Sequence, residues 1–391
     1  MASSRQLLIS YFLASMASSL VVAGPQVPCF FIFGDSTVDN GNNNGLATSA
    51  KANYTPYGVD FPDGPTGRFC NGKNIADVIA ELLGFDSFIP PFATASGTTI
   101  LSGVNYGSGA AGIRDETGQQ LGELISMNKQ LLNHQTSISR IVKFLGSEEA
   151  AAKYLNKCIY AVAIGSNDYI NNYLLPKHYP TSHIYTPEEY AVVLTQQYSQ
   201  QMRTLHRNGA RKVALFGLGL IGCTPDEMAT YGTNGSCVTM IEDYVQMFNN
   251  RLKSLIDELN GDFSDAKFVY IDSYEASLSA AYGTGVSYTT TPCCHVSLSL
   301  GKAQCAPGTV PCSNRSSYAF WDGFHPTEII NTYLGERAYS AKSPYDAYPT
   351  DIKGLAELQL GEDQIQPKDK LKNWRWSMIK SLFSGPMLGG F

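Results

Sequence analysis

After its first 24 residues the chain has no hydrophobic run that approaches the roughly 18 consecutive apolar residues of a transmembrane helix. It also has no excess of positive charge, because 28 lysines and arginines stand against 34 aspartates and glutamates, scattered along the chain. This balance argues against binding to nucleic acid, whose phosphates are usually contacted by clustered basic residues. No internal repeat is evident, so a repeat architecture is not indicated.

Two common ligand-binding motifs are incomplete. Residues 67–74 (GRFCNGKN) resemble a phosphate-binding P-loop, but Asn74 stands where a serine or threonine would hold magnesium, and no apolar strand precedes the loop. Asn74 is better explained as the N-cap of a helix over residues 75–83 that Gly84 ends. Residues 293–295 (Cys-Cys-His) are potential metal ligands, but their spacing matches no common zinc pattern. We therefore expect neither a nucleotide nor a metal at these stretches.

The first 24 residues have the composition of a secretory signal peptide. One positive charge, Arg5, precedes an apolar stretch over residues 7–22 that serines interrupt, and residues 21–23 (Val-Val-Ala) provide a small-residue cleavage site. We therefore expect residues 1–24 to be removed and the protein to be secreted. The chain that follows is long enough for one large α/β domain with loop insertions, over residues 25–361.

A C-terminal extension over residues 362–391 follows that domain. Its basic residues are Lys368, Lys370, Lys372, Arg375 and Lys380, and its apolar residues at helical spacing are Leu371, Trp374, Met378 and Leu382. A basic amphipathic helix of this kind can contact a membrane surface or an anionic polymer. The simpler interpretation, which we favour, is a frayed extension without a function of its own.

Nine cysteines in an exported chain predict disulfides, and the odd number leaves at least one thiol unpaired. Cys29 and Cys158 each stand at the start of an apolar strand and could be bridged if those strands are neighbours. Cys223 with Cys237 would close a short loop. Four more cysteines fall in one loop-like region that needs cross-links: Cys293, Cys294, Cys305 and Cys312. Cys70 is then the candidate for the unpaired thiol.

Three sequons predict N-glycosylation. Their acceptor residues are Asn53, Asn234 and Asn314. Sugars at these positions would place the corresponding loops on the surface.

Apolar runs and helical patterns alternate along the chain. Strands are predicted over residues 30–34, 104–106, 158–164, 212–218 and 267–271, and helices over residues 75–83, 121–145, 190–208 and 238–259. This alternation predicts an α/β fold with a parallel sheet and helices on both of its faces. Ligands of such folds bind at the carboxyl ends of the strands.

The first predicted strand leads directly into a polar corner. Residues 30–44 begin as an apolar run that stops at Gly34, which permits a tight turn. Asp35 is a good helix N-cap, and Ser36 would then stand at a strand-to-helix corner with its hydroxyl exposed. Such a corner suits a nucleophile. A Gly-Asp-Ser sequence by itself, however, would indicate no more than a capped helix start.

Two more polar segments follow predicted strands. Residues 107–112 (GSGAAG) form a glycine-rich loop whose amides can approach a ligand closely, and Asn167 follows the third predicted strand. Because the carboxyl ends of parallel strands meet at one edge of a sheet, Ser36, Gly109 and Asn167 would lie close together.

A motif near the end of the chain supplies what a serine nucleophile lacks. A serine hydroxyl is a poor nucleophile at neutral pH, so it needs a base that titrates near pH 6.5, such as histidine, and an acceptor that orients this base. Asp322 and His325 lie three apart in one predicted turn, and Pro326 favours an extended conformation at His325. Alone, an Asp-x-x-His sequence would indicate a capping aspartate beside a structural histidine. Following the three polar strand ends, it favours catalysis.

Taken together, these motifs resemble those of the plant-type GDSL esterases and lipases of the SGNH hydrolase superfamily. The resemblance spans residues 29 to about 360, and its main motifs are Phe-Gly-Asp-Ser36, Asn105-Tyr-Gly-Ser-Gly109, Gly165-Ser-Asn167-Asp and Asp322-Gly-Phe-His325-Pro-Thr-Glu. It implies a flavodoxin-like three-layer sandwich with a five-stranded parallel sheet, without a metal or another cofactor. It also implies a plant protein of the apoplast.

The resemblance assigns roles to site residues. It implies Ser36 as the nucleophile, His325 as the general base and then acid, and Asp322 as the residue that orients His325. The backbone N–H groups of Ser36 and Gly109 and the side-chain amide of Asn167 would form the oxyanion hole. Three glycines (Gly107, Gly109 and Gly112) are candidates for the second donor, and we choose Gly109. Threonine stands at position 37, where the family name has leucine.

The function predicted from this set is hydrolysis of a carboxylic ester, of a small molecule, a lipid or a polymer, by a secreted serine esterase. Two alternatives remain at this point. An acyltransferase would pass the acyl group to an alcohol, and the motifs do not distinguish it from a hydrolase. A catalytically silent binding protein could share the fold, although the intact set of polar residues argues against it.

Overall fold

The computed structural model describes residues 24–286, 291–296 and 303–360, and all structural statements refer to these residues. The predicted signal peptide, apart from Gly24, and the predicted C-terminal extension lie outside them. No helix within the described ranges is long and apolar enough to cross a membrane.

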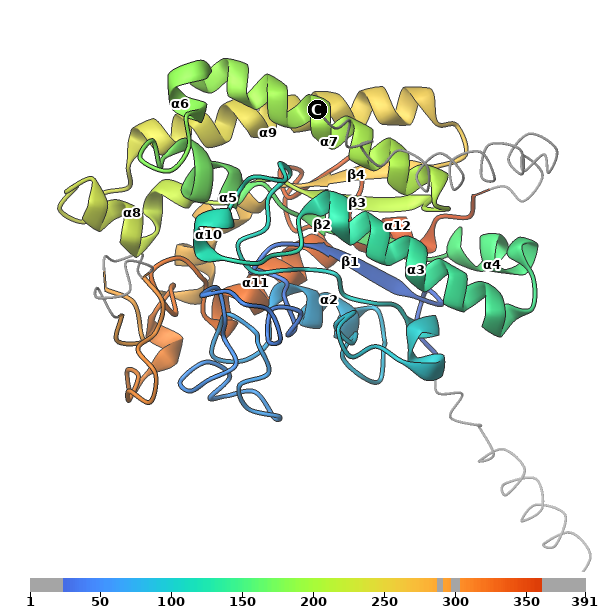
Figure 1. Ribbon diagram of the computed structural model, residues 1–391, viewed down its shortest axis with the longest axis horizontal. Coiled ribbons are helices and arrows are strands. Elements are labelled where there is room, and N and C mark those ends of the chain that lie inside the picture. Colours follow the sequence, from blue (N-terminus) through green and yellow to red (C-terminus); the bar gives the residue numbers. More distant parts are fainter. Residues whose placement is uncertain (1–23, 287–290, 297–302, 361–391) are drawn as a thin grey trace, which may run out of the picture.

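Five strands form one sheet in the order β1-β2-β3-β4-β5, which runs through the middle of the molecule (Figure 1). The strands are β1 (Phe30–Gly34), β2 (Ile159–Ala163), β3 (Lys212–Phe216), β4 (Lys267–Ile271) and β5 (Ala347–Tyr348). The first four are parallel, with Gly34 opposite Ala163. The prediction of a parallel sheet is therefore confirmed for β1 to β4, whereas β5 pairs with β4 in antiparallel orientation.

The predicted strand over residues 104–106 lies beside β1. The Ile32 N–H donates to Val104 O at 3.1 Å, and the Tyr106 N–H donates to Ile32 O at 2.7 Å. Only Asn105 forms a ladder pair with β1, so the segment is a single parallel bridge and not a full strand. The chain thus leaves β1 towards one side and later returns to its other side at β2. The carboxyl ends of β1 and β2 form the switch point where doubly wound folds bind ligands.

Helices cover both faces of the sheet, and this arrangement confirms the three-layer sandwich (Figure 1). One face packs against α3 (Met127–Leu145), α7 (Pro187–Arg207) and α9 (Thr239–Asp262), and the other against α2 (Ile75–Leu82), α11 (Glu328–Tyr339) and α12 (Ile352–Glu357). The strands are apolar on both sides, as strands buried between two helix layers must be. In β1, Phe31 and Phe33 pack into the first layer, and Phe30 and Ile32 into the second.

Further helices lie between and beside these elements. They are η1 (Gly97–Ser102), η2 (Gln119–Leu121), α4 (Glu148–Leu155), α5 (Ser166–Asp168), η3 (Tyr169–Tyr173), α6 (Thr181–Ile184), η4 (Ile221–Cys223), α8 (Pro225–Thr230), α10 (Ser273–Thr284) and η6 (Arg315–Ser317). α5 directly follows β2, so its first turn lies at the switch point.

Helix ends follow local capping chemistry. Asn74 caps α2 in a reciprocal capping box with Asp77, which confirms the predicted start of this helix. α7 begins earlier than predicted, because Thr186 and Glu189 form a second capping box. α3 begins later, since the preceding residues pair with another loop, as the Ser49 N–H donation to Leu121 O shows.

Four disulfides are present among the described residues, and they agree with the predictions. Cys29 is bonded to Cys158 and Cys223 to Cys237, while the loop region contains Cys293–Cys312 and Cys294–Cys305. Cys70 is the free cysteine, as predicted, and burial raises the pKa of its thiol to about 12. The three sequon asparagines are exposed, so their glycosylation stays a prediction that the fold permits.

Candidate active site

The turn after β1 presents Ser36. A side chain at Gly34 would come within 2.3 Å of the Ala163 carbonyl oxygen, so β1 and β2 can meet here only through a glycine. Asp35 Oδ1 accepts hydrogen bonds from the Thr37 N–H at 2.9 Å and from its hydroxyl at 2.7 Å. The threonine that replaces the leucine of the family name therefore adds a hydrogen bond to the corner that carries Ser36.

Ser36, His325 and Asp322 form a hydrogen-bonded chain. His325 Nε2 lies 2.7 Å from Ser36 Oγ, and His325 Nδ1 lies 2.8 Å from Asp322 Oδ2. A carboxylate can only accept, so Nδ1 carries a proton and Nε2 is free to accept the serine hydroxyl. Asp322 is fully buried, and its Oδ1 accepts the backbone N–H groups of Phe324 and His325 at 2.9 and 2.8 Å. The fold thus brings together three side chains that lie up to 289 residues apart.

The glycine-rich loop corrects one prediction. The Gly109 N–H donates to Asp39 Oδ2 at 2.9 Å and is therefore unavailable to a ligand. The next residue, Ala110, lines the cavity beside Ser36, and its N–H has no acceptor within the described part of the chain. Its φ of 67° lies in the left-handed region, which an alanine rarely adopts.

Asn167 and Ser36 complete the polar edge. The Asn167 Oδ1 accepts from Asn171 at 2.7 Å, which fixes the amide so that its nitrogen faces the loop. Its Nδ2 donates to Ala111 O at 3.0 Å and has a second hydrogen to offer. The backbone N–H of Ser36, like that of Ala110, has no acceptor within the described residues.

Two buried carboxylates bind backbone N–H groups in and directly after the glycine-rich loop. Asp39 accepts the N–H groups of Gly41 and Asn42 at 2.7 Å in addition to that of Gly109, and burial raises its pKa to about 6. Asp168 accepts the Ile113 N–H at 2.8 Å, and burial raises its pKa to about 7. The sequence analysis did not predict these contacts, although Asp39 lies in the segment over residues 30–44 and Asp168 directly follows Asn167.

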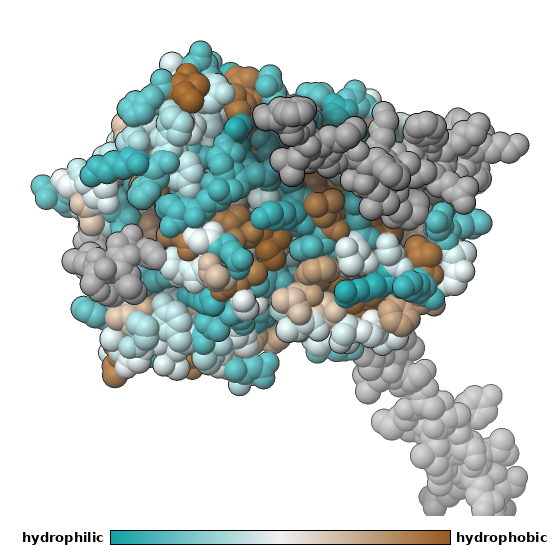
Figure 2. All heavy atoms as spheres, in the orientation of Figure 1, coloured by the Kyte–Doolittle hydropathy of each residue, from teal (hydrophilic) through white to brown (hydrophobic). Residues whose placement is uncertain are grey.

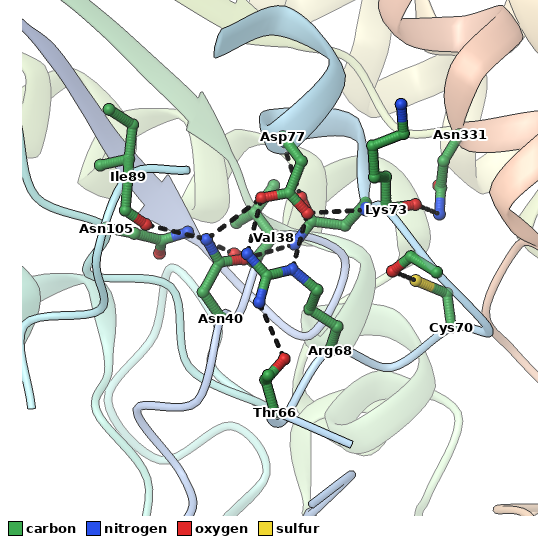
Figure 3. Close-up of polar contacts among 12 residues, drawn as sticks. Val38, Asn40, Thr66, Arg68, Cys70, Lys73, Asp77, Ile89, Asn105 and Asn331 are labelled. Atoms are coloured by element: carbon green, nitrogen blue, oxygen red, sulfur yellow. Dashed lines mark hydrogen bonds and ion pairs between the residues drawn. The ribbon is translucent and has the colours of Figure 1, made fainter. Parts of the chain in front are cut away.

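A second buried network of polar contacts surrounds the residues that follow Ser36 in the chain (Figure 3). Arg68 forms a bidentate ion pair with Asp77. Both nitrogen–oxygen distances are 2.7 Å, and both side chains are buried. Asn40 donates to Ile89 O at 3.0 Å, and Asn105 donates to Val38 O at 2.6 Å. These contacts tie the segment after Ser36 to α2 and to the bridge beside β1.

The same network explains the P-loop-like sequence. Arg68 is paired with Asp77 (Figure 3). Lys73 forms a partly exposed ion pair with Glu81 at 2.8 Å. Asn74 caps α2. Both basic residues of this P-loop-like sequence therefore form ion pairs within the protein. This agrees with the interpretation that the sequence is not a nucleotide-binding loop.

A cavity of about 370 Å³ lies at the carboxyl ends of the strands, with Ser36 and His325 in its wall. Most of the remaining wall is apolar, and includes Phe69, Leu121, Ile170, Leu174, Phe216 and Phe320. In the space-filling view, hydrophobic residues gather near the middle of the face (Figure 2). On one side the wall is acidic, with Asp226 and Glu227 from α8. Burial and the charge of Asp322 raise the pKa of Asp226 to about 6.

Glu227 makes the stability of the protein depend on pH. It is 5 % exposed, its carboxylate has no hydrogen bond within the described residues, and burial together with Asp226 raises its pKa from 4.5 to about 7. Between these values the folded state holds a proton that the unfolded chain has released, so the free energy of unfolding falls as pH rises. We expect Glu227→Gln to raise this free energy by on the order of 2 kcal/mol at pH 8 and to change it little at pH 4. Urea unfolding at both pH values checks this, and an equal effect at both would contradict it.

The comparisons with known proteins agree with this geometry. Residues 30–338 match the family of GDSL-like lipases and acylhydrolases. Three proteins of Arabidopsis thaliana, each named GDSL esterase/lipase, are 52 %, 50 % and 48 % identical to the chain. These alignments cover 86 %, 86 % and 88 % of this chain and 93 %, 94 % and 96 % of the relatives. The chain belongs to the GDSL-like lipase/acylhydrolase family.

Family membership places the chain among the carboxylic-ester hydrolases, in agreement with the sequence prediction. The GDSL corner is residues 34–37, and it lies at the switch point of the sheet. The alternative metal interpretation of residues 293–295 is wrong, because Cys293 and Cys294 are both in disulfides. No three His, Cys, Asp or Glu side chains are grouped as metal ligands within the described ranges.

Proposed function

We propose that this GDSL family member is a secreted serine esterase that hydrolyses a carboxylic ester through an acyl-enzyme on Ser36. The observation that carries the proposal is the 2.7 Å contact between His325 Nε2 and Ser36 Oγ, with Asp322 on the other ring nitrogen. This is the arrangement in which a histidine can accept a serine proton.

The reaction proceeds in two halves. Ser36 Oγ attacks the ester carbonyl carbon while Nε2 of His325 takes the hydroxyl proton, and a tetrahedral oxyanion forms. The carbon–oxygen bond to the alcohol then breaks, His325 returns the proton to the departing alcohol, and the acyl group stays on Ser36. Water repeats the attack with His325 again as base, and the carboxylic acid leaves.

The oxyanion is stabilised by three donors in this proposal. They are the backbone N–H groups of Ser36 and Ala110 and the side-chain amide of Asn167, all from residues in the cavity wall. Ala110 replaces Gly109 of the sequence prediction, because the Gly109 N–H already donates to Asp39. Each preorganised donor is typically worth about 3 kcal/mol in the transition state. Asp39 and Asp168 keep the loop in the conformation that leaves the Ala110 N–H free.

The cavity supports an ester with an apolar part. Its wall is largely aliphatic and aromatic, which favours burial of an acyl chain of a small-molecule or lipid ester. Secretion is supported by four disulfides among the described residues, since such cross-links persist in oxidising compartments. For a relative of plant proteins, that compartment is the apoplast.

Incubation of the purified protein with p-nitrophenyl esters of short and long acids, with and without a small alcohol, tests the function. We expect free acid as the main product, because nothing in the acyl-enzyme mechanism excludes water from the second half-reaction. The preferred chain length would define the acyl class. New ester as the main product would identify an acyltransferase instead. If neither product forms and a fluorophosphonate does not label Ser36, the protein is a silent binder and the proposal fails.

A further inference from the structure

Tyr57 contacts the side of Asp322 that the backbone N–H groups do not reach. Its phenol is fully buried, and it donates to Asp322 Oδ2 at 2.6 Å. The same phenol oxygen accepts the Cys305 N–H at 3.2 Å. A tyrosine hydroxyl has one proton, and a carboxylate can only accept, so the Cys305 contact leaves the phenol proton directed at Asp322.

We propose that Tyr57 is a positioning residue for ester hydrolysis, which holds the Asp322 carboxylate against His325 Nδ1 and is itself held by the backbone N–H of Cys305, which a disulfide joins to Cys294. This inference rests on the proposed function, because it assigns Tyr57 a role through the residue that orients the catalytic base.

The hydrogen bonds of Asp322 show why the contact matters. Oδ1 accepts two backbone N–H groups and also lies 2.9 Å from His325 Nδ1, whereas Oδ2 contacts only His325 Nδ1 and the Tyr57 hydroxyl among the described residues. Without the hydroxyl, His325 Nδ1 is the one hydrogen-bond partner that these residues leave to Oδ2. Burial and the charge of Asp322 raise the pKa of Tyr57 well above its ordinary value. The phenol therefore remains a donor throughout the working pH range.

The Cys294–Cys305 disulfide links the residue that contacts Tyr57 to the residue that contacts the chain before Asp322. Cys305 is bonded to Cys294, and the Cys294 N–H donates to the carbonyl of Trp321, the residue before Asp322, at 2.8 Å. Tyr54 adds a parallel link, since its hydroxyl donates to Cys305 O at 2.9 Å and its ring packs edge-on against Tyr57 at 5.3 Å. The two bonded cysteines therefore contact Tyr57 and the residue before Asp322, respectively.

The test is Tyr57→Phe, which keeps the ring and removes only the hydroxyl. We expect kcat to fall about tenfold, the size expected for one lost hydrogen bond to a charged group. KM stays unchanged, because Tyr57 does not line the cavity. The acid limb of the pH–rate profile moves to higher pH, because a carboxylate with one donor fewer stabilises the protonated base more strongly. A purely structural role would reduce the amount of active enzyme without moving this limb.

Tyr160→Phe is the matched control. It removes another buried phenol hydroxyl, one that donates to Leu155 O at 3.2 Å outside the cavity wall, and we expect kcat to stay within about twofold of the unaltered protein. Rates are expressed per site labelled by a fluorophosphonate, so misfolded protein is not counted. Equal losses in both variants with an unmoved acid limb would overturn the inference, as would an unchanged Tyr57→Phe enzyme. An unaltered protein that neither labels nor hydrolyses would instead overturn the proposed function.

Discussion

Ser36→Ala is expected to lower kcat for ester hydrolysis by a factor of about 10⁶, because the acyl-enzyme has no other oxygen on which to form. His325 would keep its contact with Asp322, so a histidine-activated water is the only residual route. The measurement is the release of p-nitrophenol from a short-chain ester, followed at saturating substrate. Labelling by a fluorophosphonate should disappear with the activity.

The loss must arise from chemistry and not from unfolding. Ser36 is only partly buried and its side chain is small, so the free energy of unfolding should change by less than about 1 kcal/mol. Ser139→Ala on α3 is a matched control, since this serine donates within its own helix to Gln135 O at 3.1 Å, away from the cavity. If Ser36→Ala retained activity above a hundredth of the unaltered rate, the assignment of the nucleophile would be refuted.

The sheet was predictable from sequence where strands are apolar on both sides. The strand over residues 267–271 has the predicted bounds, because its last four residues are buried between two helix layers. β5 was missed, since a strand of two residues has too few positions to show any period. α9 continues past the predicted stop at Asn260 and Gly261. There the Asn260 side chain binds the backbone of Phe268 in β4, a contact that the sequence does not reveal.

The polar strand ends were predictable for a different reason. A parallel topology brings the carboxyl ends of strands to one edge, so Ser36 and Asn167 could be placed together from the order of the strands alone. The choice of Gly109 failed because it depends on the direction of one N–H group. The Gly109 N–H is bound by Asp39, 70 positions earlier, and the loop continues through an Ala110 in the left-handed region. Neither feature has a signature in a segment with three glycines.

Tyr57 illustrates contacts that no local pattern could reveal. It lies 265 positions before Asp322 in a stretch without regular structure, and the two meet only in the folded chain. A tyrosine in a loop rich in glycine, proline and asparagine has no distinguishing spacing. Its role follows from the full set of partners around a buried carboxylate, which requires coordinates.

Asp322→Asn is expected to reduce kcat by about 10⁴ while the fold persists. The amide oxygen can replace Oδ1 and accept the N–H groups of Phe324 and His325, which leaves the amide nitrogen where Oδ2 faced His325 Nδ1. An N–H donor at this position stabilises the tautomer whose proton is on Nε2. That nitrogen then donates to Ser36 and cannot take the hydroxyl proton, although every atom remains in place.

The tautomer argument can be separated from a general loss of a buried charge. Asp346→Asn is the matched control, because Asp346 is 1 % exposed, pairs with Arg337 and accepts backbone N–H groups, yet lies outside the cavity wall. We expect this control to lower the urea midpoint but to keep kcat per fluorophosphonate-labelled site. For Asp322→Asn the opposite pattern should hold, with a near-normal midpoint and slow labelling. A kcat within tenfold of the unaltered protein would mean that Asp322 serves to cap the turn and does not select the tautomer of His325.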